Sequence, residues 1–152
     1  MSLVVGTNSY ITLGEANTYL SDRYDNSVWM SEQYRSSAIV TAARLLDSQL
    51  KWLYCKTDSD QDMEWPRTGF AGVDDDVVPQ KVKDAQAELA FDIVKNGALP
   101  EGFKDTSLKS LKAGSVELVY KNGSMKTSSM IPKHIRNMVV AYTSSGYRVQ
   151  RA

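Results

Sequence analysis

The segment from residue 77 to residue 97 constrains the fold most, because it carries the start and stop signals of one complete helix. Its apolar side chains recur at three- and four-residue spacing, which places on one stripe Val78, Val82, Ala85, Leu89 and Ile93. Pro79 suits the first helical turn, where its missing N–H costs no hydrogen bond, and Asn96-Gly97 is a typical left-handed stop. The sequence therefore predicts a core helix around which the other segments pack.

A bulky corner precedes this helix. It consists of Glu64, Trp65, Pro66 and Arg67, which follow one another directly. We expect Trp65 to fill a pocket beside the helix and Pro66 to fix the turn of the chain, while Arg67 should pair with a carboxylate, either Glu88 or Asp47. The predicted structural anchors of the fold are therefore Trp65, Pro66, Arg67, Pro79 and Leu89.

Two further helices are predicted nearer the N-terminus. Thr12 and Glu15 match a capping box, so a short helix should begin there and run to about Arg23. A longer helix is expected from about Ser31 to Gln49. One face of that helix, apolar at its centre, carries Arg35, Ala38, Ile39, Ala42, Leu45, Leu46 and Gln49.

The C-terminal third combines a predicted β-hairpin with one more helix. Asn122-Gly123 is a strong turn signal between two β-leaning runs, which predicts a hairpin at about residues 115–128. Pro132 should open a helix whose shared face carries Ile135, Met138, Val139 and Tyr142. We therefore expect a mainly α fold: a small helical bundle in a single domain, residues 1–146, with the hairpin inserted near its C-terminal third and an extended tail, residues 147–152.

The composition excludes several classes of protein. With 152 residues, of which 42% are hydrophobic and 24% charged, the chain suits one globular domain. No apolar run approaches the roughly 20 residues that cross a bilayer, and no cleavable secretion signal is evident, so we expect no membrane partner and no secretion. Cys55 is the only cysteine, which rules out an internal disulfide.

The formal net charge of zero hides an asymmetry. Residues 1–78 hold twelve acidic and six basic side chains, whereas residues 79–152 hold six acidic and twelve basic ones, so the two parts carry −6 and +6. This division favours contact between copies of the chain, or an acidic partner for the C-terminal part. The alternative is that the two sets of charges face each other within one fold.

Candidate metal and catalytic residues do not form a recognisable site. Asp58, Asp60 and Asp62 alternate like the first ligands of a calcium loop, but Met63 stands in place of the required glycine and Gly69 in place of the bidentate glutamate.

His134 is the only histidine, and Cys55 could be a nucleophile only with His134 as its base. The chain also lacks a phosphate-binding glycine loop and a dinucleotide fingerprint. We therefore expect no enzyme activity, no cofactor and no metal.

Aromatic side chains interleaved with lysines and arginines could stack on single-stranded nucleic acid. The candidates are Trp29, Tyr34, Trp52, Tyr54, Trp65, Phe70 and Tyr120. Most of them stand at helix or corner positions that burial explains equally well, and the chain lacks the basic excess of such binders. We predict that these aromatics mainly pack the core.

The order of several short motifs over residues 5 to about 95 resembles one family. These motifs are Gly6-Thr-Asn-Ser-Tyr-Ile-Thr12, Glu15-Ala16, Tyr19, Trp29, Ala38, Ala42, Leu46-Asp47, Trp65-Pro66-Arg67, Val78-Pro79, Val82, Ala85 and Glu88-Leu89-Ala90. They are similar to those of the head-to-tail adaptor (connector, head-completion) proteins of tailed phages, which often carry the label "putative DnaT-like single-stranded DNA-binding protein".

The resemblance implies a structural virion protein in the neck between portal and tail, assembled in the host cytoplasm. Its subunits would form a homo-oligomer, a twelve-membered ring that contacts the portal protein and a tail or second neck protein. Genomic DNA would pass through the lumen without sequence specificity. The DnaT-like label implies, as the alternative, a protein that binds single-stranded DNA.

In similar adaptors the C-terminal segment reaches into the portal. The matching candidates for portal binding here are Tyr147, Arg148, Val149 and Arg151. This tail is too short to fold alone, so it should order only on a partner. The partner could be the portal, with Tyr147 and Val149 as buried anchors, or DNA, with the two arginines on phosphates.

Overall fold

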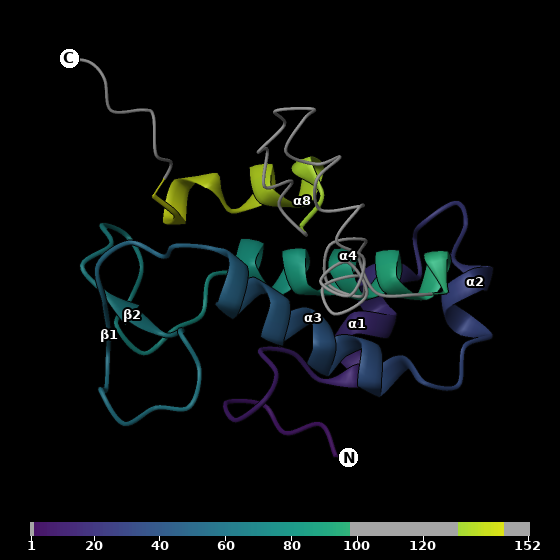
Figure 1. The fold of residues 1–152 in the computed structure, drawn as a ribbon, viewed down its shortest axis with the longest axis horizontal. Coiled ribbons are helices and arrows are strands. Elements are labelled where there is room, and N and C mark those ends of the chain that lie inside the picture. Colours follow the sequence, from purple (N-terminus) through teal and green to yellow (C-terminus); the bar gives the residue numbers. More distant parts are fainter. Residues whose placement is uncertain (1, 98–130, 145–152) are drawn as a thin grey trace, which may run out of the picture.

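The computed structural model describes residues 2–97 and 131–144, and it is mainly helical, as predicted (Figure 1). The elements are α1 (Leu13–Leu20), α2 (Ser27–Met30), α3 (Arg35–Gln49), β1 (Cys55–Lys56), β2 (Arg67–Thr68), α4 (Gln80–Asn96), α8 (Lys133–Met138) and the 3-10 helix η1 (Val140–Tyr142). The hairpin predicted at residues 115–128 and the tail at residues 147–152 lie outside the described residues. Within the described ranges, no helix combines the length and apolarity needed to cross a bilayer.

Helix α4 is the centre of the bundle. It contacts α1, α2 and α3 as well as α8, and Figure 1 shows α8 on the opposite side of α4 from α1 and α3. Val82, Ala85 and Leu89 are completely buried, which confirms the predicted apolar stripe. Pro79 is the N-cap and not a member of the first turn, while Gly97 ends the helix in the left-handed conformation with φ +63°.

The first helix begins at the predicted capping box. The Glu15 N–H donates to Thr12 Oγ1 at 3.0 Å, and the Thr12 N–H donates to Glu15 Oε2 at 2.9 Å. The helix ends at Leu20 and not at Arg23, because Arg23 turns toward α4. There its guanidinium pairs with Glu88 at 2.6 Å and lies 4.1 Å from the ring centre of Phe91.

The helix predicted to begin at about Ser31, which is α3, begins four residues later, at Arg35. Residues 31–34 form turns, and a separate short helix, α2, precedes them; its Trp29 is buried and donates its indole N–H to Asn17 at 2.8 Å. Burial of one large indole with its polar atom satisfied explains why the chain turns here. The centre of the predicted face of α3 is buried. Its buried residues are Ala38, Ile39, Ala42, Leu45 and Leu46.

A buried amide joins three parts of the bundle. The Gln86 side chain, on α4, has no exposed surface, and its Nε2 donates to Ser9 Oγ and to the Ile39 carbonyl, both at 2.9 Å. Its Oε1 accepts from the Tyr10 N–H at 3.0 Å. The N-terminal segment is thereby tied to both α3 and α4, a connection that the apolar periodicity of α4 does not predict.

The last helical segment packs on α4 with the predicted face. Ile135 and Val139 are buried, and Met138 and Tyr142 lie partly buried against the same core. The α-helix ends at Met138, and the 3-10 helix η1 carries the chain one further turn. This segment then meets the corner region, since the Leu53 N–H donates to the Tyr142 carbonyl at 3.0 Å.

Candidate functional site

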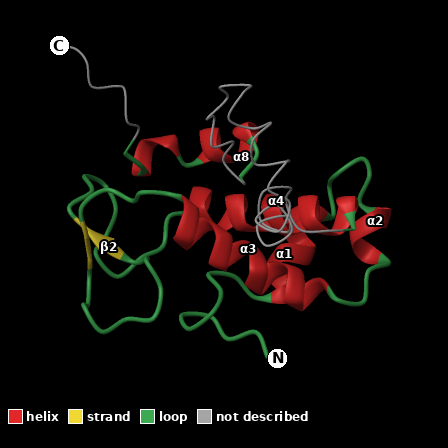
Figure 2. Ribbon diagram, in the orientation of Figure 1, coloured by secondary structure: helices red, strands yellow, loops and turns green. Residues whose placement is uncertain are grey.

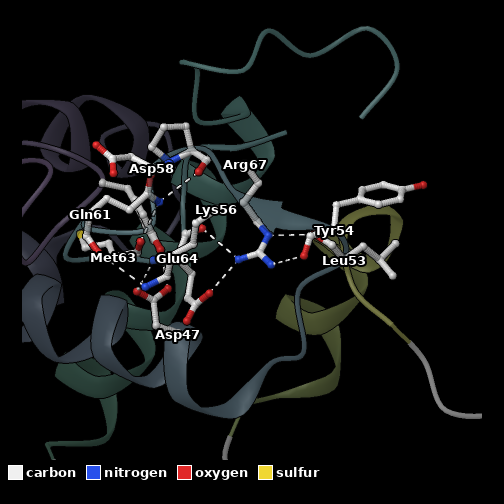
Figure 3. Close-up of polar contacts among 11 residues, drawn as sticks. Asp47, Leu53, Tyr54, Lys56, Asp58, Gln61, Met63, Glu64 and Arg67 are labelled. Carbon is white, nitrogen blue, oxygen red and sulfur yellow. Dashed lines mark hydrogen bonds and ion pairs between the residues drawn. The ribbon is translucent and has the colours of Figure 1, made fainter. Parts of the chain in front are cut away.

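The most elaborate polar site among the described residues is built around Arg67, at the end of the bundle where β1 and β2 pair antiparallel (Figures 2 and 3). The side chain is 6% exposed. Its Nε donates to the Leu53 carbonyl at 2.8 Å and its Nη2 to the Tyr54 carbonyl at 2.6 Å. Its Nη1 donates to both the carbonyl and the carboxylate of Glu64, at 3.0 and 2.7 Å. A single guanidinium thus closes the loop between residues 53 and 67.

The partner of Arg67 is therefore Glu64, and the expectation of Glu88 or Asp47 is wrong. Glu88 pairs with Arg23, as described above. Asp47 accepts a hydrogen bond from the Tyr10 hydroxyl and another from the Glu64 N–H, the latter at 3.2 Å. Arg67 finds its carboxylate three residues away because the loop folds back on itself, a geometry that sequence spacing does not reveal.

Burial raises the pKa of the Asp47 carboxyl to about 6, although its hydrogen bonds from Tyr10 and Glu64 act in the opposite direction. Burial, with Asp47 nearby, also raises the pKa of the Tyr10 hydroxyl. Tyr10 therefore keeps its proton and donates it in the hydrogen bond to Asp47. Burial makes the ionisation of Asp47 unfavourable within the fold.

An aromatic cluster lies beside the Arg67 site. Trp65 contacts Trp52 edge-on with ring centres 5.5 Å apart, stacks on Phe70 at 5.3 Å and contacts Tyr142 edge-on at 5.5 Å. Trp65 is 2% exposed, and the peptide bond that joins it to Pro66 is cis. The cluster joins the corner to η1, so the pocket of Trp65 is made largely by other aromatic rings.

Two polar atoms inside this cluster have no hydrogen-bond partner in the described part of the chain. They are the indole nitrogens of Trp52 and Trp65, both fully shielded from solvent. Buried indole N–H groups usually find an acceptor, so this pair marks an unusually apolar environment.

Tyr54 forms the outer edge of the same cluster. Its ring meets Phe70 edge-on, with centres 4.7 Å apart, yet the residue is 58% exposed. Its backbone is left-handed, with φ +64°, a conformation that is rare for residues with a bulky side chain. In Figure 3 the Tyr54 ring points away from the Arg67 network, on the side opposite Asp58.

The loop that carries Asp58, Asp60 and Asp62 is held by hydrogen bonds of its own backbone and of the Gln61 side chain. Gln61 donates to the carbonyls of Met63 and Pro66, at 2.8 and 3.0 Å, and accepts from the Asp58 N–H. Asp58 in turn accepts from the Asp60 N–H at 2.9 Å. Across residues 2–97 and 131–144, no group of three or more histidine, cysteine or acidic side chains is placed to hold a metal ion.

Cys55 adjoins this site because β1 pairs with β2 and places it opposite Thr68, whereas His134, Pro79 and Leu89 lie on other elements. Cys55 is exposed in β1, and His134 is exposed on α8. Pro79 and Leu89 lie on α4, at its cap and in its buried face. The portal-binding candidates Tyr147, Arg148, Val149 and Arg151 lie outside the described residues, as does Tyr120.

The prediction that the aromatics mainly pack the core is confirmed for the three tryptophans and wrong for two tyrosines. Trp29, Trp52 and Trp65 are buried, whereas Tyr34 is 65% and Tyr54 is 58% exposed. The sequence sign of the Tyr54 exposure is the Gly69 that follows Arg67 and Thr68, since a glycine there lets a ring lie directly on the backbone.

The division of charge is partly neutralised inside the fold. Lys83 pairs with Glu15 at 3.8 Å and Lys95 with Asp25 at 3.3 Å, so two basic residues of the second part face acidic residues of the first. Such exposed pairs add little to the stability of a fold, because solvent screens the two charges. These contacts favour the within-fold alternative for part of the asymmetry.

The fold and site define a mainly helical protein with an aromatic cluster and a buried arginine at one end of its bundle. A family model described as "Putative DnaT-like ssDNA binding protein" matches residues 2–152, and the chain belongs to that family. Neither the curated proteins nor the solved structures contain a match.

Proposed function

We propose that the protein binds single-stranded DNA without sequence specificity and does not act as an enzyme. The observation that carries this proposal is the family match over residues 2–152, whose description names single-stranded DNA as the ligand. The sequence motifs alone favoured the head-to-tail adaptor over binding of single-stranded DNA, and the family match reverses that preference.

The site can supply the physical requirements of such binding. Single strands are held by aromatic faces on which bases stack and by cations along the phosphates. Tyr54 and the partly buried Phe70 offer aromatic surface at one end of the bundle, and the exposed Lys51 lies three residues before Tyr54. Because the net charge is zero, a single copy should bind weakly and several copies more tightly.

The test is a filter-binding titration of the full chain with a thymine oligonucleotide over a range of salt concentrations. Binding should be measurable at low salt and weaken as salt rises, because phosphate contacts release counterions. Competition by double-stranded DNA should be poorer than competition by the single strand. Absence of binding at low salt would contradict the proposal.

A second candidate is the head-to-tail adaptor, a subunit of a ring that joins portal to tail in the virion neck. Besides the motif resemblance, exposed apolar side chains favour an assembly role. They gather on and beside α2, at the end of the bundle opposite β1 and β2 (Figure 2), and comprise Tyr24, Val28, Met30 and Tyr34. Exposed apolar groups of this kind often mark contacts with other chains.

The two candidates are separated by capture on the portal protein. An adaptor should be retained by the portal and form a closed oligomer, twelve-membered by resemblance, in native mass spectrometry. DNA would then thread the ring, and tight binding of free single strands is not required. A persistent monomer that the portal does not retain would remove the adaptor candidate.

A further inference from the structure

We infer that Tyr54 is the stacking residue of this protein, a surface ring held ready to receive one unpaired nucleobase. The inference rests on the proposed binding of single-stranded DNA and names the residue that would carry it. Three observations support it: the backbone of Tyr54, the support under its ring and its contrast with the other exposed tyrosines.

The backbone of Tyr54 is held in an unfavourable conformation by a dedicated residue. A left-handed φ of +64° is rare for a residue with a bulky side chain and persists only where its surroundings impose it. The Arg67 guanidinium does so by binding two successive carbonyls, those of Leu53 and Tyr54. Such local strain is commonly found at functional sites.

The ring of Tyr54 rests on a rigid support. Gly69, with φ +104°, lies directly beneath it, and a Cβ atom at that position would stand 2.9 Å from Tyr54 Cγ. Phe70 meets the ring edge-on and is itself stacked on the buried Trp65. The ring is thus fixed on one side and open on the other, so a stacked base would cost little side-chain entropy.

Tyr34, another strongly exposed tyrosine, is less suited to DNA. Tyr34 borders a cavity of about 260 Å³ together with Glu32, whose carboxylate accepts a hydrogen bond from the Tyr34 N–H at 2.9 Å. A carboxylate in that position repels phosphate. Tyr54 instead stands between Lys51 and Lys56 in the sequence, and its carbonyl accepts a hydrogen bond from the Arg67 guanidinium.

The decisive variant is Tyr54→Asn in the full chain. Asparagine tolerates the left-handed backbone, so this change removes the ring while the Arg67 contacts to the two carbonyls can remain. We expect the affinity for a thymine oligonucleotide to fall between about 5-fold and 100-fold, the range for loss of one stacked base. The slope of affinity against salt should stay the same, because no phosphate contact is lost.

Two controls complete the experiment. Tyr54→Phe keeps the aromatic face and should bind within about 2-fold of the unaltered chain, and Tyr34→Ala removes a comparably exposed ring and should also bind normally. A direct readout uses an oligonucleotide containing iodouracil, which on irradiation should crosslink to Tyr54, as located by mass spectrometry of the digested protein.

The outcomes distinguish this inference from the function on which it rests. If the unaltered chain does not bind the oligonucleotide, the proposed function fails and the inference fails with it. If the unaltered chain binds but Tyr54→Asn binds equally well, or Tyr34→Ala loses as much, only the inference is overturned. If Tyr54→Phe loses as much affinity as Tyr54→Asn and the melting temperature also changes, Tyr54 has a structural role and the inference is overturned.

Discussion

The side chain of Gln86 accepts a hydrogen bond from the backbone N–H of Tyr10 at 3.0 Å, across 76 positions of the chain. The same amide donates to Ser9 and to the Ile39 carbonyl, so one buried polar group bonds three others from two other parts of the chain. The arrangement fixes where the N-terminal segment crosses the pair of long helices.

Replacing Gln86 with leucine should therefore destabilise the protein strongly. The change leaves the buried Tyr10 N–H without its acceptor and removes the two bonds that Gln86 donates, so we expect a loss of about 1–3 kcal/mol in the free energy of unfolding. Urea denaturation measures the loss. Gln80→Leu is the matched control, because the exposed Gln80 bonds only Asp84 one turn away and should change stability by less than about 0.5 kcal/mol. Equal effects would show that the buried network is unimportant.

Trp65→Ala should remove the centre of the aromatic cluster. Because Trp65 is buried between Trp52, Phe70 and Tyr142, we expect a loss of about 3–5 kcal/mol, enough to threaten a domain of ordinary marginal stability. Thermal unfolding checks this, with the exposed Tyr24→Ala as the comparison. A nearly unchanged melting temperature would mean that the ring contributes to an interface and not to the fold.

The Asp47 carboxyl should make stability depend on pH below neutrality. Its pKa in the folded protein, about 6, exceeds the ordinary value of 3.8, so the folded state binds the proton more tightly than the unfolded state does. Stability from this group is therefore greatest below pH 4 and falls as the pH rises toward and through 6.

Asp47→Asn should abolish that fall. Between pH 4 and 7, the unfolding free energy of the variant should rise relative to the unaltered protein by on the order of 1–3 kcal/mol. Denaturation at several pH values gives the difference directly, and the same subtraction for the exposed Asp76→Asn is the control. A difference that does not vary with pH would contradict the raised pKa.

Deletion of residues 146–152 should leave the fold intact, because they follow the last described contact of the bundle, the Ser144 N–H to the Lys51 carbonyl. If the tail binds DNA, neutral replacement of Arg148 and Arg151 should weaken binding and flatten its salt dependence. If it binds the portal, Tyr147→Ala and Val149→Ala should abolish capture instead. Paired portal capture and filter binding, on the full and shortened chains, decide between them.

Local signals predicted the helices well. The Thr12–Glu15 capping box and the Gly97 stop act within a few residues of themselves, and the apolar spacing along α4 follows directly from helical geometry. These features are readable because each depends on its neighbours in the chain alone.

The site was less predictable because it depends on contacts between distant residues. The hydrogen bonds of Gln86 and the contact of η1 with Trp65 join segments that are far apart in sequence, and β1 pairs with β2 across an irregular loop that no periodicity predicts. The left-handed backbone of Tyr54 has no sequence signature, since tyrosine is not a residue that favours it. Tertiary packing selected these features over local preference.

The buried indoles of Trp52 and Trp65 give this end of the molecule its own optical signal. Their rings lie 5.5 Å apart and nearly perpendicular, with both nitrogens shielded from solvent, so their emission should occur at shorter wavelength than that of a solvated indole. Trp29, the third tryptophan, donates to Asn17 at the far end of the bundle and reports on that end separately. Single replacements of tryptophan by phenylalanine would therefore let an intrinsic spectrum record whether the two ends of the bundle come apart together or in succession.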